Sequence, residues 1–409
     1  METTYLINSI WILCASVFVF MMQMGFACCE SGFARGKNAC NIWLKNFCDF
    51  CVGALVYYFI GFGFMYGDDW HGIIGINGFF DPLNQDIAVW QGMEGSLSPQ
   101  VYLLFQTMFC ATTATIISGA VAERFKFNTY LILSAFMTGI VYPVIGHWVW
   151  GGGWLSQIGF SDFAGSGAVH MCGGIAALVA TVGVGPRIGK YVNGKSVAIP
   201  GHNISMAMLG GFILWVGWYG FNPGSELAFD DVTLYTTVTT TFAASAGGLT
   251  ALFFTWIKYG KPDPTLAMNG ALAGLVAVCT GVAEVTYIGS MIIGVIAAIM
   301  FTISVSVLDN KFHIDDVAGA ISLHGMSGSL GVILPGFLST ENGLLYGGGA
   351  GRLVSQFIGM ISIWVFTVIC VSIIIFILKK TIGIRVPEEI ELAGLDITEH
   401  GMIAYPEKY

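Results

Sequence analysis

The sequence predicts an all-α polytopic membrane protein with eleven transmembrane helices. Of its 409 residues, 55% are hydrophobic and only 10% are charged, whereas soluble domains carry about 25% charged residues. The 55 glycines are about twice the usual share, and small residues let membrane helices approach closely. These observations exclude an ordinary soluble globule and favour packed membrane helices.

The apolar runs, taken in order, give the expected helices. A bilayer requires about 20 apolar residues per helix, and most of the runs are near that length. The runs cover residues 4–28, 42–66, 98–122, 128–150, 164–185, 203–221, 233–257, 266–283, 285–308, 316–338 and 352–378. No basic residue precedes Arg35, so we expect the first run to be a retained helix and not a signal peptide.

The basic residues predict the orientation of the chain. Of the 16 Lys and Arg residues, all except Arg352 follow odd-numbered runs. The positive-inside rule then places the N-terminus outside and the C-terminus inside. The opposite loops carry acidic residues, which would attract cations or would simply keep the loops in water. No basic tract occurs, so we expect no nucleic-acid partner.

A short motif, AGx4Hx3G, occurs twice. The first copy contains His170 in the fifth run, and the second contains His324 in the tenth. Because five is odd, the two blocks have opposite orientations, as in inverted repeats whose interface holds the substrate site. We therefore predict a five-plus-five inverted repeat with one further helix, although a motif this short and rich in glycine can also recur by chance.

His170 and His324 are also the histidines that lie well inside predicted helices. A histidine in hydrocarbon is costly and usually faces a partner or a pore. A lone histidine could be a satisfied structural residue. Two at repeat-related positions favour a functional pair that lines a path for a small polar molecule or a proton.

Aromatic residues gather near the predicted outer ends of three helices. The group, with one serine, comprises Phe105, Phe109, Trp148, Trp150, Trp218, Phe221 and Ser225. One interpretation is an interfacial aromatic belt. The other is a cation–π site, worth about 2 kcal/mol or more once desolvated.

Several segments resemble the ammonium transporter (Amt/Mep/Rh) family. They are GFACCESGFARGKNACNIWLKNF (25–47), FQTMFCATTATIISGAVAERFKF (105–127), HWVWGGGW (147–154), DFAGSGAVH (162–170), WYGFNPGS (218–225), GALAGLVA (270–277), DDVAGAISLHGMSG (315–328) and GIRVPEEIELAGLD (383–396). The resemblance covers nearly the whole chain. It implies a multi-pass protein of the plasma or inner membrane that forms a homotrimer with one pore per subunit.

The resemblance also implies roles for individual residues and the substrate. The outer ammonium site would be Phe109, Trp150 and Ser225, the phenyl gate Phe109 and Phe221, the pore lining His170, His324 and Trp218, and the vestibule Asp162 and Phe105. Asp162 would be largely structural. The substrate would be ammonium or ammonia, with methylammonium as a second substrate, and we expect no cofactor, metal or catalytic residue.

We expect two parts in the chain. Residues 1–380 form the membrane domain, with repeat one at about 1–200, repeat two at about 201–340 and helix eleven at about 350–380. Residues 381–409 resemble the family's cytoplasmic regulatory tail, which implies a PII-type signal protein or a fused signalling domain as partner.

Some positions depart from the commoner pattern of the family. They include Gly167, Pro223, Glu284 and the segment DDVAG at 315–319. These departures leave open whether this chain conducts. The alternative is an ammonium-binding sensor on the transporter fold, which binds ammonium with little or no flux and signals to a cytoplasmic domain.

Three other motifs suggest chemistry that we do not expect. GMSG at 325–328 matches a short motif of intramembrane serine proteases, but such matches are frequent in a chain rich in glycine and serine. Cys48 and Cys51 form a CxxC, for which we expect packing and no redox or metal role. Residues 313–316, with one histidine and two aspartates, could suggest a metal site, but we expect a solvated cytoplasmic loop.

Overall fold

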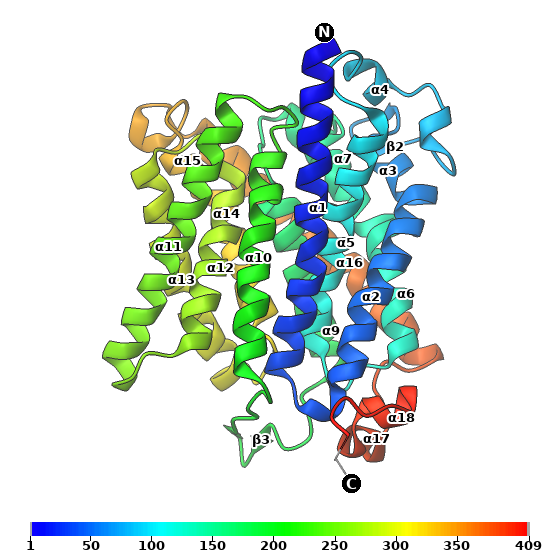
Figure 1. The fold of residues 1–409 in the computed structure, drawn as a ribbon, viewed down its shortest axis with the longest axis vertical. Helices are drawn as coiled ribbons and strands as arrows, with labels where there is room; N and C mark the ends of the chain where they lie inside the picture. Colours follow the sequence, from blue (N-terminus) through cyan, green and yellow to red (C-terminus); the bar gives the residue numbers. More distant parts are fainter. Residues whose placement is uncertain (1, 407–409) are drawn as a thin grey trace.

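The computed structural model describes residues 2–406, which form a bundle of eleven helical spans (Figure 1). Each span is long and apolar enough to cross a membrane and coincides with one predicted run, so the all-α prediction is confirmed. We call the end of the bundle with Glu2 the upper end and the end with Pro406 the lower end. The end of the predicted tail, with Lys408, lies outside the described residues.

The long helices form the spans, and short helices and two hairpins lie at the ends. The first five spans contain α1 (Glu2–Phe33), α2 (Ala39–Val56), α3 (Phe62–Tyr66), α5 (Pro99–Val121), α6 (Phe127–Phe136), α7 (Tyr142–Trp150), α8 (Trp154–Gln157) and α9 (Cys172–Val184). The other six contain α10 (Ile204–Gly224), α11 (Asp231–Tyr259), α12 (Pro264–Val278), α13 (Tyr287–Asn310), α14 (Ser327–Ile333), α15 (Pro335–Leu338) and α16 (Gly351–Thr381). Outside the spans are α4 (Ala88–Gly92), α17 (Glu388–Ala393), α18 (Leu395–His400), β1 (Asp69–Trp70), β2 (Ile74–Gly75), β3 (Tyr191–Val192) and β4 (Lys195–Ser196).

Some helices begin or end at other residues than the apolar runs. In both cases below, buried or capping polar residues account for the difference. The first run ends at residue 28, but α1 continues to Phe33 because Glu30 and Ser31 are buried. The tenth run begins at 316, but its helix begins at Ile321, where Asp316 accepts the first backbone N–H groups.

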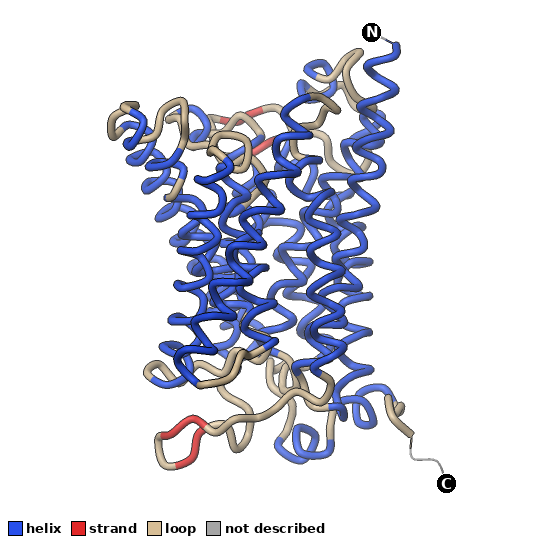
Figure 2. Tube along the Cα trace, turned by 60° about the vertical axis from the view of Figure 1, so that its left-hand side comes forward, coloured by secondary structure: helices blue, strands red, loops and turns tan. Residues whose placement is uncertain are grey.

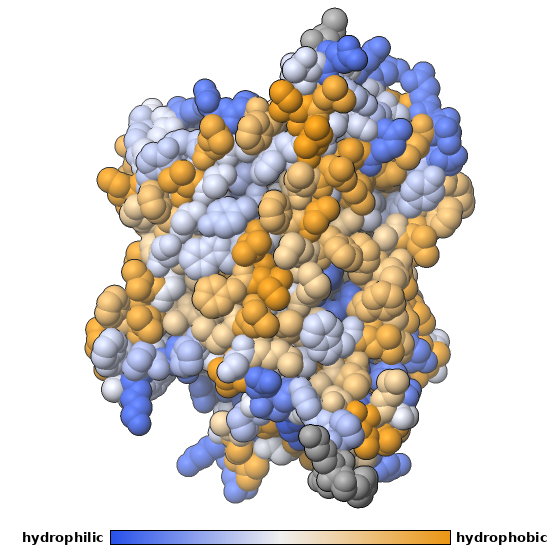
Figure 3. Space-filling view, viewed as in Figure 1, coloured by the Kyte–Doolittle hydropathy of each residue, from blue (hydrophilic) through white to orange (hydrophobic). Residues whose placement is uncertain are grey.

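Apolar side chains predominate between the two ends on the face of the bundle shown in Figure 3, and large apolar side chains are exposed on several other helices. Ile257 on α11, Ile288 on α13 and Phe376 on α16 are 85%, 69% and 63% exposed. Soluble proteins rarely expose contiguous apolar surfaces of this extent. The exterior therefore fits a hydrocarbon solvent, in which helices satisfy their own backbone groups.

The first helix of each half packs against its counterpart through glycines. A Cβ on Gly32 of α1 would lie 2.5 Å from the backbone nitrogen of Ala207. A Cβ on Gly210 of α10 would lie 2.5 Å from the backbone nitrogen of Cys29. Only glycine permits this approach, as in other closely packed membrane helices.

Small elements close the two ends of the bundle. The hairpin β1–β2 lies at the upper end and the hairpin β3–β4 at the lower end (Figure 2). The tail helices α17 and α18 also lie at the lower end, where α18 packs beside α2 (Figure 1).

Candidate pore

Both repeat-related histidines lie on π-helical turns. His170 is part of the turn Ser166–Met171, and His324 is part of the turn Ile321–Met326. The glycine that precedes each turn has a positive φ, 104° in the first copy and 75° in the second, which glycine adopts at little cost. The two copies of the motif therefore fold alike, in a conformation that is frequent at functional sites.

Asp162 holds the first of these turns. Its carboxylate accepts the Thr280 hydroxyl at 2.7 Å and three backbone N–H groups, those of Gly165, Gly167 and Ala168, at 3.0, 2.8 and 2.9 Å. Burial raises the pKa of Asp162, against the lowering effect of these hydrogen bonds. The contacts fit the structural role implied by the resemblance, and they account for a buried carboxyl group.

Asp316 holds the second turn in the same way. It lies eight residues before His324, and its oxygens accept the N–H groups of Ala320 and Ile321 at 2.9 and 2.7 Å. Burial raises the pKa of Asp316 to about 6 despite these bonds. Asp316 was not among the predicted site residues, although extending the repeat to DxAGx4Hx3G would have found it.

The structure brings the two histidines together. Their Nδ1 atoms are 3.2 Å apart, and their ring centroids are 5.2 Å apart at 23°. His170 is fully buried and His324 is 2% exposed. The backbones behind them also meet, because a Cβ on Gly174 would lie 2.0 Å from the nitrogen of Gly325. Gly174, the last glycine of the first motif, and Gly325 thus permit the close approach of the two turns.

Aromatic rings stack above His170. The rings of Phe109 and Phe221 are parallel within 16° with centroids 4.1 Å apart, and Phe221 stacks on His170 at 5.1 Å. Trp218 also stacks on His170, at 5.2 Å, and donates its indole N–H to the Cys279 sulfur at 3.3 Å. These rings form an apolar, closed layer between the histidines and the upper end.

A cavity of about 180 Å³ opens above the stacked phenyl rings. Its lining consists of Tyr66, Tyr102, Phe105, Gln106, Phe109, Trp150, Phe163, Ser225 and Leu227. Trp150 donates its indole N–H to the Asp162 carbonyl at 2.7 Å. Ser225 donates its hydroxyl to the Phe221 carbonyl at 2.8 Å, so its oxygen lone pairs stay available. The buried Gln106 Oε1 has no partner among the described residues. Aromatic faces and free oxygen acceptors attract a small cation.

Comparison with known proteins identifies this architecture. A profile of the Ammonium Transporter Family matches residues 10–405. The chain belongs to the ammonium transporter family. It is 42% identical to ammonium transporter Amt2 of Archaeoglobus fulgidus, over 98% of this chain and 88% of the relative. It is 44% identical to a putative ammonium transporter of Synechocystis, over 98% and 89%.

Solved structures of the family share the fold of this ammonium transporter homologue. A structure described as a sensor Amt protein has a TM-score of 0.92 at 36% identity, covering 98% of this chain and 100% of its own. Mep2 of Candida albicans has a TM-score of 0.86 at 28% identity, covering 94% and 87%. With eleven apolar spans, the chain is therefore a multi-pass membrane protein.

The upper cavity contains residues that the sequence analysis did not select. Tyr102 and Gln106 lie on α5 in the same face as Phe109, so extending the i, i+4 pattern by one turn would have found them. Tyr66 lies at the end of α3, and no sequence pattern indicates that it reaches the cavity.

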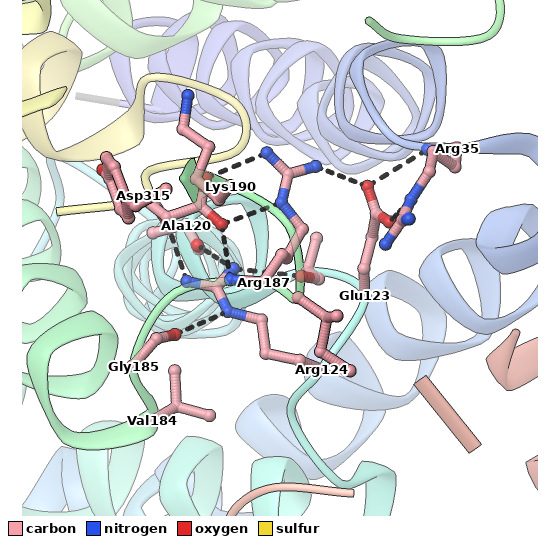
Figure 4. Close-up of polar contacts among 12 residues, drawn as sticks. Arg35, Ala120, Glu123, Arg124, Val184, Gly185, Arg187, Lys190 and Asp315 are labelled. Carbon is pink, nitrogen blue, oxygen red and sulfur yellow. Dashed lines mark hydrogen bonds and ion pairs between the residues drawn. The ribbon is translucent and has the colours of Figure 1, made fainter. Parts of the chain in front are cut away.

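An ionic cluster joins the loops at the lower end (Figure 4). Arg187 donates to both oxygens of Asp315, at 2.8 and 2.9 Å, and to Glu123 at 2.6 Å. Arg35 also pairs with Glu123, and Arg124 donates to the carbonyls of Gly185 and Asp315 at 3.1 and 2.7 Å. The four loops that carry these residues, after α1, α5, α9 and α13, are thereby tied together.

The cluster corrects one expectation. We expected residues 313–316 to form a solvated loop, but Asp315 is only 2% exposed. Burial alone would raise the pKa of Asp315, but the hydrogen bonds of Arg187 and the charges of Arg187 and Arg124 hold it at about 2. His313 is exposed as expected. The expectation fails because a charged loop can be buried when its charges are paired.

The remaining sequence alternatives find little support in the geometry. The Ser327 hydroxyl donates to the Ser322 carbonyl at 3.3 Å, which is not the nucleophile–base pair of a protease. Within residues 2–406, no three His, Cys, Asp or Glu side chains are arranged to hold a metal ion.

All ten cysteines are free. Glu284 pairs with Arg352 at 2.7 Å, so these two unusual charges neutralise each other.

Proposed function

We propose that this chain transports ammonium across a cell membrane as ammonia. One observation carries the proposal: an aromatic cavity with free acceptors, a stacked phenyl pair and a buried histidine pair follow one another in a single column. Membership of the ammonium transporter family supports the substrate. The substrate undergoes no net chemical change, since the proton lost on entry is regained on exit, so the proposed activity is not that of an enzyme.

Recruitment takes place in the upper cavity. Phe109 and Trp150 present aromatic faces, with ring centroids 6.4 Å apart, and Phe105 extends the aromatic wall. Cation–π contacts of this kind are worth about 2 kcal/mol or more when desolvated. The Ser225 oxygen replaces one hydrogen bond that ammonium loses from water.

The phenyl gate requires the ion to lose its proton. The rings of Phe109 and Phe221 are 2% and 0% exposed, and no polar group of either side chain can solvate a charge. Moving an ion into such surroundings costs at least several kcal/mol. Ammonia is neutral and passes without this cost. Potassium cannot lose a proton, so the same gate excludes it.

The histidine pair then receives ammonia. The His170 Nε2 atom is buried and has no hydrogen-bond partner among the described residues, so it can bond to a passing molecule. Trp218 holds the ring of His170 from one side. The two imidazoles thus provide polar contacts in a pore that is otherwise apolar.

Flux into proteoliposomes tests the proposal. Purified protein should alkalinise the vesicle lumen in response to an inward ammonium gradient, because arriving ammonia takes up a proton, and a potassium gradient should give no signal. His170→Ala and His324→Ala should each lower the ammonium signal at least about tenfold, whereas the exposed His71→Ala should not. Wild-type flux that survives both pore substitutions unchanged would refute the twin-histidine pathway.

The same assay separates the transporter from the sensor alternative. A transporter gives flux that grows with protein per vesicle. A sensor gives saturable ammonium binding, measured by calorimetry, with no flux. Saturable binding without flux would overturn transport and leave the upper cavity as a receptor site.

The topology and partners belong to the same proposal. Residues 1–380 would form the membrane domain, with the upper end outside and the lower end, with the tail from 381 onward, in the cytoplasm. The distribution of basic residues supports this orientation. We further propose a homotrimer and a PII-type protein or a signalling domain at the lower end. Native mass spectrometry and protease access to the tail test both statements.

A further inference from the structure

A second, much smaller cavity lies between His324 and the lower part of α1. Its volume is about 30 Å³, above the roughly 10–15 Å³ that a cavity needs to hold one water molecule. One ammonia or ammonium therefore fits in it. The walls are mainly apolar, and Glu30, Asn269 and His324 are the polar side chains with oxygen or nitrogen that reach it.

Glu30 is the acidic residue of this cavity. Contacts with neighbouring helices hold its side chain in place. It is 2% exposed, and Asn46 donates an amide N–H to its Oε2 atom at 3.0 Å. A Cβ on Gly119 would lie 3.3 Å from the Glu30 Cγ atom, so glycine leaves the space that this side chain occupies. A buried carboxyl group within a membrane-spanning bundle is costly, so its place beside a path for ammonia indicates a function.

Behind Glu30 lies a group of buried polar residues on α2. Lys45 and Asp49 are both 0% exposed, and Tyr130 donates its hydroxyl to Asp49 at 2.6 Å. The Lys45 Nζ, the Asn46 Oδ1 and one Asp49 oxygen have no partner among the described residues. Two carboxyl groups and one ammonium group sum to a charge of −1 when all are ionised. The group therefore accommodates one more positive charge.

That charge can be a proton on Glu30 or an ammonium ion in the cavity. We infer that Glu30 is the acid that returns a proton to ammonia at the lower end of the pore, an inference that rests on the proposed transport function. The O–H bond of the Glu30 carboxyl group breaks and a new N–H bond forms on ammonia. The products are an ammonium ion and the Glu30 carboxylate, which remain paired in the cavity.

The step conserves the charge of the buried group, because a neutral acid and a neutral base become an ion pair. No isolated charge is created in the apolar cavity, which would cost several kcal/mol. Ammonium then leaves to the solution at the lower end, and Glu30 regains a proton from hydronium in that solution. The reverse sequence serves flux in the other direction.

The charges that face Glu30 come from two sides. Lys45 and Asp49 face it from α2, and His324 faces it across the cavity. Arg124 and Glu399 act on Lys45 from the lower end. The other residues that line the cavity from α5, α10 and α12 are uncharged. Glu30 is therefore the carboxyl group of this set that contacts the transported molecule.

The test compares Glu30→Gln with wild type in vesicles whose orientation is read from protease access to the tail. Glutamine keeps the size and the acceptor for Asn46 but carries no acidic proton. We expect ammonium flux to fall at least about tenfold, and its dependence on the pH at the lower end to disappear. Glu30→Asp, which keeps an acidic proton, should retain part of the ammonium flux and part of its pH dependence. Glu389→Gln, which removes an exposed carboxyl group at the same end, should behave as wild type.

The outcomes are distinct. Wild type without flux refutes the proposed function, whereas Glu30→Gln with the wild-type rate and pH profile refutes only the role of Glu30. If Glu30→Gln does not fold, infrared difference spectra of wild type labelled with ¹³C-glutamate replace it. Ammonium, but not sodium, should remove a protonated glutamate band, and Glu30→Asp should lack that change. An unchanged glutamate band in wild type would overturn the inference.

Discussion

Asp162 and Asp316 occupy equivalent places in the two halves of the chain. Each lies eight residues before a pore histidine, and each accepts the backbone N–H groups that open the π-helical turn of that histidine. The two aspartates differ in burial and in the number of hydrogen bonds that they accept. Asp162 is 3% exposed and also bonds Thr280, whereas Asp316 is half-buried with two N–H partners.

This difference predicts unequal effects of the same substitution. Asp162→Asn replaces one acceptor with an amide donor that faces buried N–H groups, and it should lower the free energy of unfolding by about 3 kcal/mol. Asp316→Asn should cost about 1 kcal/mol. Denaturant unfolding in detergent measures both, with the exposed Asp86→Asn as the control. Equal losses for Asp162→Asn and Asp316→Asn would contradict the unequal burial described here.

The close approach of Gly174 and Gly325 predicts that a larger residue at position 174 is not tolerated. Gly174→Ala places a Cβ 2.0 Å from a backbone nitrogen that cannot move independently, and we expect a loss of about 3 kcal/mol or more together with loss of flux. Gly92→Ala is the matched control, because nothing lies within 4 Å of that position. It should leave stability unchanged or raise it by up to about 1 kcal/mol. A stable Gly174→Ala protein with normal flux would disprove the close crossing.

The Arg187–Asp315 pair predicts an acid dependence of stability. Because the pKa of Asp315 is about 2 in the folded protein and about 3.9 in an unfolded chain, unfolding takes up a proton between these values. The stabilisation, about 2 kcal/mol, is complete above about pH 5 and is lost as the pH falls towards 2. Asp315→Asn should lose about 2 kcal/mol less than wild type over that range. Parallel pH profiles would show that the pair is not formed.

Asp316 has the opposite dependence. Burial raises the pKa of Asp316 to about 6, so the neutral form of its carboxyl group is favoured in the folded protein. Its contribution to the free energy of unfolding therefore declines as the pH rises from about 4 to about 6. Comparing the slopes of Asp315→Asn and Asp316→Asn between pH 2 and pH 7 separates the two carboxyl groups.

Glu391 is one of the buried residues that hold the tail to the lower end, together with Asp396, which accepts the N–H groups of Cys40 and Asn41. Glu391 accepts the Ile188 N–H at 2.7 Å and the Arg385 guanidinium at 2.7 Å, and it is 1% exposed. Glu391→Gln removes the charge that holds Arg385, and amide hydrogens of residues 384–396 should exchange at least about tenfold faster. Exposed Glu388→Gln should not change exchange. Unchanged protection in Glu391→Gln would mean that the tail is held by other contacts.

The sequence predicted the spans and the histidine pair well because each depends on local patterns. A helix that crosses hydrocarbon needs a long apolar run, and the repeated motif places His170 and His324 at equivalent depths. The aromatic face of Phe105 and Phe109 followed from helical spacing alone. Their assembly into a column with Phe221 required the fold.

The sequence did not predict contacts between distant loops. Arg187 and Asp315 are far apart in the chain, and each alone resembles a solvated charge near a helix end. Glu30 was overlooked for a similar reason, since a carboxyl group near the end of a helix normally reaches water. Its burial depends on Gly119 and Asn46, which come from other helices.

The short contact between the two Nδ1 atoms has a consequence for the histidine pair. Two neutral imidazoles that face each other in this way share one Nδ1 proton, so their Nε2 atoms must differ. One presents a lone pair and the other an N–H. The pair therefore offers a passing molecule one hydrogen-bond acceptor and one donor, and exchanging these two roles requires both imidazoles to change tautomer.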